Sequence, residues 1–377
     1  MEKTPDSAIC DDLDWLERCR YWSAPLPARK RIGGAPRRAH KPLVLAGQGI
    51  GLRVDQGTLL IKDGFTHCPQ VQAVHRFFPR DRNMPSRIII LDGKGHITVD
   101  ALTWLGDQNV PLARINWQGH LTSLLSGAAG PDYRRIRAQI AAQEDQKTAI
   151  RIAVSLVSTK LRNSVETLQG LAPSDRTEKA IEAQRKSIKE LRCSPPKTLA
   201  GLLGIEGRCA LAYFKAWQGL EVRWKGTGRK PIPNDWLKFD TRTSTQSTKP
   251  QNRDASHPLN AMLNYAYAVL ESRVRLEIVA QGYDPMIGYL HTFSKYRAAF
   301  VFDLMEPLRP VVDRVVLDLM RSEAFEPGDF TITKDGVCRL NAQLAKHLVS
   351  KFMNTLEGQS WPCLPTSSLR MMPKCRA

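Results

Sequence analysis

The pattern of hydrophobic and polar positions changes character along the chain. A basic, irregular arm over residues 1–41 precedes short β-type segments over residues 42–127, where apolar runs alternate with Gly- and Asp-containing turns. Over residues 131–356 the apolar positions recur every three or four residues, as in amphipathic helices. Residues 357–377 show no periodicity and are predicted to be disordered. We therefore predict an α+β fold, with an N-terminal β-rich domain, structural or dimer-forming, followed by a larger all-helical domain.

Within the β-rich part, the pattern predicts a strand over Arg87–Leu91, a helix over Asp100–Gly106 and a strand over Val110–Trp117. The Asp92–Gly95 segment that follows the first strand is predicted to form a β-turn. It is not a phosphate-binding loop, because it lacks the spacing to a second Gly and the Ser or Thr that follows Lys in such loops. This part carries few candidate catalytic residues.

The helical part begins with regular helical spacing and is then interrupted by a polar stretch. The spacing predicts helices over Tyr133–Glu144, Lys147–Leu171, Arg176–Arg192 and Lys197–Gly219. The polar stretch, Val222–Ser256, is net basic and contains Trp224, Trp236 and Phe239. Basic groups with interspersed aromatics suit a mobile contact with nucleic acid. A plain surface loop explains the same composition equally well.

Beyond the polar stretch, the pattern predicts a helix that begins at Pro258 and a second helix over Tyr296–Met320. Pro307 and Pro310 interrupt the second helix. Because proline lacks a backbone N–H and clashes with the preceding turn, we predict a kink or a break directly after Glu306.

Composition narrows the classes of function. The chain of 377 residues has 55 Lys and Arg against 37 Asp and Glu, a net charge of +18. This excess favours a polyanionic partner, because phosphate contacts release condensed counterions. Eight cysteines without a Cys-x-x-Cys pair argue against a structural zinc site and a disulfide framework. No run approaches the ~18–20 apolar residues of a membrane helix, and the polar N-terminus lacks an apolar signal core, so we expect a cytoplasmic protein.

Four side chains that can bind a metal stand out on otherwise apolar segments. Glu206 and His291 each lie among apolar residues, and Asp303 and Glu306 share one helix face. Each has an ordinary explanation: a salt bridge to a core Arg, a hydrogen-bonded core histidine, or a solvated acidic face. Together they form an oxygen-rich donor set with one imidazole, which suits Mg²⁺ or Mn²⁺ better than zinc. Near nucleic acid, such an ion polarises a phosphate oxygen.

Four co-linear segments resemble a known family. Their sequences are GLLGIEGRCALAYFKAW, HPLNAMLNYAYAVLESRV, GYDPMIGYLH and FDLMEPLRPVVD. In order and approximate spacing they are similar to the signature segments of the CRISPR-associated endonuclease/integrase of spacer acquisition (the "Cas-one" family). The resemblance extends back through ILDGKGHITVDALTWL and covers roughly Leu43 to Met320.

The resemblance implies a divalent-metal site in the helical domain. Its metal ligands would be Glu206, His291 and Glu306, with Asp303 as a supporting acid in the catalytic set. The implied cofactor is Mg²⁺ or Mn²⁺. The resemblance also places a family Asn-Tyr segment on three further residues, which we expect to shape the site or contact DNA: Asn260, Asn264 and Tyr265.

The resemblance further implies an activity in antiviral defence. Members insert a short double-stranded DNA, the spacer precursor, into a CRISPR array by attack of each 3′-hydroxyl on a phosphodiester. The implied assembly is a homodimer, formed through the β-rich domain, in complex with a small spacer-acquisition partner ("Cas-two"). Two alternatives stay open. One is a stand-alone nuclease on branched DNA or a transposon integrase with the same site, and the other is a non-catalytic DNA-binding scaffold.

Overall fold

The computed structural model describes residues 42–65, 72–116, 121–125, 132–228, 230–243, 254–291 and 298–357. The predicted arm, and the predicted tail apart from its first residue, lie outside these ranges. No helix in the described ranges is long and apolar enough to cross a membrane.

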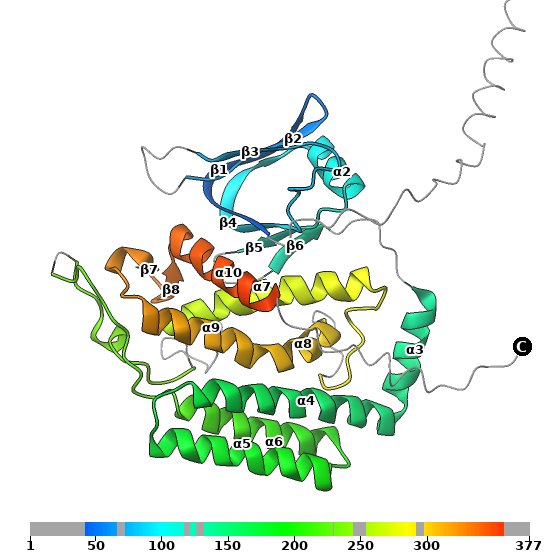
Figure 1. Ribbon diagram of the computed structural model, residues 1–377, viewed down its shortest axis with the longest axis vertical. Helices are drawn as coiled ribbons and strands as arrows, with labels where there is room; N and C mark the ends of the chain where they lie inside the picture. Colours follow the sequence, from blue (N-terminus) through cyan, green and yellow to red (C-terminus); the bar gives the residue numbers. More distant parts are fainter. Residues whose placement is uncertain are drawn as a thin grey trace, which may run out of the picture. The chain divides into compact units, whose positions relative to one another are not determined.

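The N-terminal strands of the described chain form one six-stranded sheet in the order β3-β2-β1-β4-β5-β6 (Figure 1). Their bounds are β1 (Leu43–Asp55), β2 (Thr58–Lys62), β3 (Val74–Phe77), β4 (Ile88–Ile97), β5 (Leu112–Ile115) and β6 (Leu121–Leu125). The β1–β4 and β4–β5 pairs are parallel, and the other pairs are antiparallel. Helix α2 (Val99–Asp107) makes the crossover that the parallel β4–β5 pair requires, and Thr98 caps its N-terminus.

The β-turn predicted over Asp92–Gly95 is wrong, because this segment lies inside strand β4. The strand continues alongside β1 with register shifts on both sides of Gln48. Gly95 allows the two backbones to approach, since a Cβ atom there would lie 1.8 Å from the carbonyl oxygen of Ile50. The glycines of this segment therefore serve an irregular parallel pairing rather than a chain reversal.

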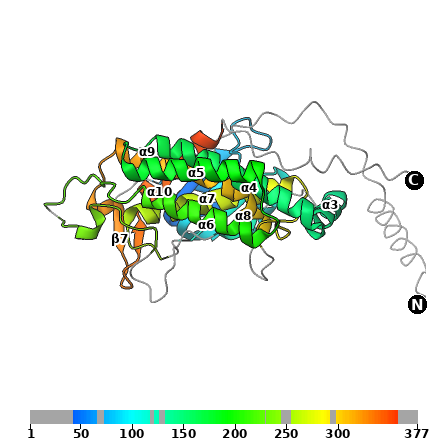
Figure 2. The ribbon, with the colours of Figure 1, turned by 90° about the horizontal axis from the view of Figure 1, so that it is seen from below.

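The rest of the described chain is mainly helical, which confirms the predicted α+β class. The helices are α3 (Tyr133–Glu144), α4 (Gln146–Gln169), α5 (Asp175–Cys193), α6 (Leu199–Lys215), α7 (Pro258–Ala280), α8 (Ala299–Met305), α9 (Arg309–Ser322) and α10 (Ala342–Glu357). Short elements lie between them, namely η1 (Asn234–Trp236), η2 (Glu306–Leu308), η3 (Pro327–Asp329) and the hairpin β7 (Phe330–Ile332)–β8 (Cys338–Leu340). Helices α4, α5 and α6 pack against one another (Figure 2).

The predicted break after Glu306 is confirmed. Helix α8 stops one residue earlier, a single 3₁₀ turn follows, and α9 begins after that turn. Pro307 and Pro310 have no backbone N–H to donate to the carbonyl groups of Asp303 and Glu306, four residues before each. The break leaves Glu306 at the junction between α8 and the 3₁₀ turn.

One hydrophobic core joins the sheet to the helices. Ala46 of β1 and Ile89 of β4 belong to the same buried cluster as Phe352 of α10. A polar contact links the same elements, because Lys346 of α10 donates a hydrogen bond to the carboxylate of Asp63, just after β2. The division into two domains that the sequence suggests stays a prediction.

Candidate active site

Glu206 and Glu306, far apart in the sequence, meet at one positive charge. The Nζ atom of Lys160, on α4, donates a hydrogen bond to Oε1 of Glu206, on α6, and another to Oε2 of Glu306, at 2.6 Å. The Lys160 side chain is 14% exposed, that of Glu206 21% and that of Glu306 7%. The cluster is therefore largely shielded, while Lys160 and Glu206 keep some contact with solvent.

Electrostatic compensation keeps Glu306 ionised. Burial opposes its charge, but Arg309 and Lys160 together outweigh burial and lower the pKa of Glu306 to about 2, and His291 adds to the effect. The Nε atom of Arg309 lies 3.3 Å from Oε1 of Glu306. Burial also opposes the charge of Lys160, yet attraction to Glu306 and Glu206 prevails and raises its pKa. Lys160 and Glu306 are therefore both charged at neutral pH.

Asp303 fixes the loop that carries His291. Its fully buried carboxylate accepts hydrogen bonds from the backbone N–H groups of residues 289–291, at 2.5–2.9 Å. The same carboxylate contacts Nδ1 of the His291 ring at 2.7 Å. Because a carboxylate only accepts, Nδ1 carries a proton in either charge state of the ring, and in the neutral ring the lone pair lies on Nε2. The ring is 39% exposed, so that lone pair is available to a ligand.

Helix α3 holds the other end of this loop. Gln139 donates through Nε2 to two loop carbonyl groups, at 2.7 and 2.9 Å, and Gln143 donates to the carbonyl of Gly288 at 2.9 Å. Gly288 allows the loop to lie against α8, since a Cβ atom there would be 3.0 Å from Oδ2 of Asp303 and 2.8 Å from the α8 backbone. Contacts within the protein thus position the loop up to His291.

The predicted Asn-Tyr segment on α7 faces a neighbouring loop. Asn260 donates to the carbonyl of Thr241 at 2.9 Å, and Arg242 donates to Oδ1 of Asn264 at 2.7 Å. Asn260 and Tyr265 are buried. Burial and these contacts favour a role in shaping the site over direct contact with DNA.

A second buried carboxylate follows on α9. Asp313 accepts hydrogen bonds from the hydroxyl of Tyr213, on α6, at 2.8 Å and from that of Tyr267, on α7, at 2.5 Å. Burial raises the pKa of Asp313 to about 6, against the lowering effect of both hydroxyls and of nearby arginines. The guanidinium of Arg309 lies 5.3 Å from the centre of the Tyr267 ring, so it connects this cluster to Glu306.

The donor chemistry of the site suits a hard divalent cation. Two carboxylates already gather around one positive charge, and the neighbouring imidazole has a fixed tautomer with a carboxylate behind it. Yet within the described ranges no three His, Cys, Asp or Glu side chains converge closely enough to hold a metal ion. The group that bridges the two glutamates is Lys160, which engages one oxygen of each carboxylate. The assignment of Glu206, His291 and Glu306 as ligands, and of these with Asp303 as catalytic, stays a prediction.

Sequence reasoning missed Lys160. The ordinary explanation for a carboxylate at Glu206 was a salt bridge to a core arginine. The structure does contain a salt bridge there, but its cation is Lys160 and not an arginine. A signal was present in the sequence: Lys160 follows Leu156 by four positions and Val157 by three, so it continues the buried stripe of α4. A lysine on an apolar stripe needs a buried partner.

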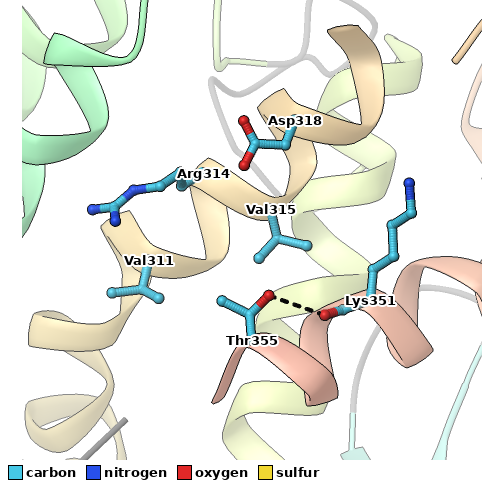
Figure 3. Close-up of a pocket in the computed structure, with 6 residues that line it drawn as sticks. All are labelled: Val311, Arg314, Val315, Asp318, Lys351 and Thr355. Atoms are coloured by element: carbon cyan, nitrogen blue, oxygen red, sulfur yellow. Dashed lines mark hydrogen bonds between the residues drawn. The ribbon is translucent and has the colours of Figure 1, made fainter. Parts of the chain in front are cut away.

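A separate pocket of about 220 Å³ lies between α9 and α10 (Figure 3). Val311 and Val315 supply apolar lining, and Arg314 and Lys351 contribute charged side chains. The hydroxyl of Thr355 donates to the carbonyl of Lys351 at 3.1 Å. Because none of the predicted site residues lines it, this pocket is distinct from the candidate active site.

Comparison with known proteins gives concordant matches over most of the chain. A family model described as "CRISPR associated protein Cas1" matches residues 43–354. The "CRISPR-associated endonuclease Cas1 1" of Archaeoglobus fulgidus is 26% identical over 332 residues, which are 84% of this chain and 89% of that protein. A solved structure, "Casposase bound to integration product", is 27% identical with a TM-score of 0.69 and covers 85% of this chain and 84% of its own.

A second solved structure, "Cas6-RT-Cas1--Cas2 complex", has a TM-score of 0.63 and 20% identity. The match covers 91% of this chain and 35% of that one. At this identity the likeness establishes the fold alone.

Proposed function

This chain belongs to the Cas1 family, and on that premise we propose that it is a metal-dependent DNA endonuclease and integrase that inserts short DNA fragments into a CRISPR array. The observation that carries the proposal is the convergence of Glu206 and Glu306 at one cation, near a histidine whose tautomer Asp303 fixes. The A. fulgidus relative is named an endonuclease, and the similar casposase is described as bound to an integration product, which supports both activities.

We assign roles to the four residues from their contacts. Glu206, Glu306 and Nε2 of His291 would hold Mg²⁺ or Mn²⁺, and Asp303 positions His291 through the Nδ1 proton. The ion would polarise a phosphate oxygen of the DNA and stabilise the attacking and leaving oxygens. Arg309 keeps Glu306 ionised and therefore able to act as a ligand.

The proposed reaction is a transesterification of DNA. The 3′-hydroxyl of the incoming fragment attacks a phosphodiester of the array, so one O–P bond forms while another breaks and the displaced 3′-oxygen leaves with a proton. Bond energy is conserved, and no nucleoside triphosphate is needed. The net charge of +18 supports binding of the DNA backbone.

We further propose an assembly for this reaction. A homodimer forms through the β-rich part, and the dimer binds a small partner of the Cas2 type. The structurally similar complex is named for Cas1 together with Cas2, which supports this choice of partner. Size-exclusion chromatography with light scattering, with and without the partner, tests both statements.

A transposon integrase is the second candidate, because the casposase likeness favours it at 27% identity. The gene neighbourhood separates the two. A repeat array and a small partner gene support spacer integration, whereas terminal inverted repeats around the gene support transposition.

The test is Mn²⁺-dependent joining of a short duplex to a supercoiled plasmid that carries an array. His291→Ala is expected to reduce joining about a hundredfold or more, because one ligand is lost. DNA binding should persist, since it depends on Lys and Arg. His347→Ala, on α10 and 46% exposed, is the matched control and should join normally. Normal joining by His291→Ala would overturn the catalytic assignment and favour a DNA-binding scaffold.

A further inference from the structure

We infer that Lys160 is a built-in competitor for the metal ion, which occupies the position between Glu206 and Glu306 in the metal-free protein and leaves when a divalent cation binds. The inference rests on the proposed function, because it requires a metal site at these two carboxylates. The inference adds Lys160, on α4, to the candidate site. The other site residues are Glu206, on α6, and the three residues His291, Asp303 and Glu306.

The contacts of Lys160 identify it as an occupant rather than a neighbour of this position. Its Nζ atom bonds to Oε1 of Glu206 and to Oε2 of Glu306, the second at 2.6 Å. Among the described residues, Lys160 is the one whose ammonium contacts both carboxylates. The Lys160 ammonium thus bridges Oε1 of Glu206 and Oε2 of Glu306, and a metal ion that bridged the same two oxygens would take its place.

The charge balance of the cluster indicates that the metal and Lys160 exclude each other. Glu206 and Glu306 carry two negative charges, and Lys160 and Arg309 carry two positive charges. A divalent ion added to this balanced set would leave two uncompensated positive charges in a mostly buried place, which is costly. Departure of Lys160 removes the strongest repulsion, because its ammonium would otherwise touch the ion.

Lys160 is better suited to leave than Arg309. Its ammonium is carried on a flexible four-carbon stem, so the charged end can turn away while the stem stays packed. Arg309 is held on its other face by the Tyr267 ring, 5.3 Å away. Metal binding would therefore move the lysine and keep the arginine.

This exchange has a functional benefit in the metal-free protein. Two ionised carboxylates that face each other without a cation repel, and the repulsion would separate α6 from η2. Lys160 keeps them together, so the site is formed before the metal arrives. The same contact lowers the affinity for the metal, because each binding event has to displace the lysine.

The first test follows Lys160 in the unaltered protein by acetylation with an N-hydroxysuccinimide ester and mass spectrometry. In EDTA we expect slow labelling of Lys160, and in saturating Mg²⁺ a rate about threefold higher or more, since release from the two carboxylates exposes the side chain to the reagent and removes the attraction that favours its unreactive protonated form. Lys147, exposed on the same helix, is the internal reference and should not change. Equal labelling of Lys160 with and without Mg²⁺ would overturn the inference.

The second test measures Mn²⁺ binding by isothermal titration calorimetry. Lys160→Met keeps the stem and removes the charge, so we expect Mn²⁺ to bind about tenfold more tightly and the Tm in EDTA to fall by about 5 °C. Lys147→Met is the matched control and should change neither value. Wild-type affinity in Lys160→Met would contradict the inference.

A third variant covers the case in which Lys160→Met does not fold without metal. Lys160→Arg retains the charge and adds a fork of donors that suits two carboxylates, so we expect weaker Mn²⁺ binding than in the wild type. Binding as tight as wild type or tighter would argue against competition.

The two proposals fail in different ways. If the wild type binds no Mn²⁺, the proposed metal dependence is wrong and the inference falls with it. If the wild type binds Mn²⁺ while Lys160 labelling and the affinity of Lys160→Met stay unchanged, the inference alone is wrong and the metal-dependent function stands.

Discussion

Glu306 and Asp313 are both buried carboxylates on the proline-containing segment after α8, yet their surroundings differ. Glu306 bonds to the ammonium of Lys160 and lies beside the guanidinium of Arg309. Asp313 accepts hydrogen bonds from two phenol hydroxyls. Burial raises the pKa of both carboxyl groups. At Glu306 the attraction to Arg309 and Lys160 prevails and lowers the pKa to about 2, whereas at Asp313 burial prevails and raises it to about 6.

The difference separates a binding site from a structural clamp. A carboxylate compensated by a cation that can move away, as we infer for Lys160, can exchange that cation for another. The tyrosines around Asp313 cannot supply charge, because burial and the nearby carboxylate raise the pKa values of Tyr213 and Tyr267 and keep both phenols neutral. Asp313 instead ties α6, α7 and α9 together, and so holds the frame in which Glu206 and Glu306 face each other.

The largest expected effect is on strand joining, when the carboxylate of each acid is replaced by the corresponding amide. Glu306→Gln should reduce Mn²⁺-dependent strand joining about a thousandfold, about 4 kcal/mol in activation free energy, because a charged ligand is lost. Asp313→Asn should join within about threefold of the wild type below its Tm, since it does not touch DNA or metal. Joining rates at 25 °C decide this. An equal loss in both variants would remove the distinction between site and clamp.

The next effect is the pH dependence of stability at Asp313. Its pKa rises from 3.8 to about 6 on folding, so the folded state binds the proton more tightly. Its contribution is fully present below about pH 4 and is lost as pH rises through about 6, up to about 3 kcal/mol. The Tm of the wild type minus that of Asp313→Asn should therefore fall between pH 4 and 6.5. A difference that is constant across this range would contradict the raised pKa.

The smallest effect concerns a single hydroxyl of the clamp. Tyr213→Phe removes the hydrogen bond to Oδ2 of Asp313 and should cost about 1–2 kcal/mol of unfolding free energy, because a buried acceptor loses a partner. Tyr133→Phe, 74% exposed at the start of α3, should change it by less than about 0.5 kcal/mol. Urea denaturation of both variants makes the comparison, and equal costs would show that the hydroxyl contact is dispensable.

Local chemistry accounts for the features that the sequence predicts well. The bounds predicted for the helix Tyr133–Glu144 coincide with those observed, because apolar spacing and the capping Asp132 both act within a few residues. The break after Glu306 follows directly from two prolines. The strand over Asp92–Gly95 could not be predicted in this way, since pairing with β1, far away in the chain, overrides the turn preference of its glycines.

In the candidate site, too, features that depend on neighbouring residues could be predicted, and features that depend on the packing of distant segments could not. Glu206 and Glu306 could be singled out because an acid among apolar residues is unusual. The partner that they share, Lys160, is brought to them by the packing of α4, α6 and η2. From the sequence alone, Lys160 could be recognised only as a lysine on a buried stripe that needs some partner. The role of Asp303 depends on three backbone N–H groups that a loop conformation brings together, and residue spacing carries no record of that conformation.

The contact between α10 and the sheet has a consequence for the order of events during translation. Strand β1 leaves the ribosome well before the helices, yet its buried residue Ala46 shares a cluster with Phe352, near the end of the described chain. The link between Asp63 and Lys346 spans the same interval. The nascent sheet therefore exposes part of an apolar face until α10 has been synthesised, an interval in which a holding chaperone would prevent premature association of its strands.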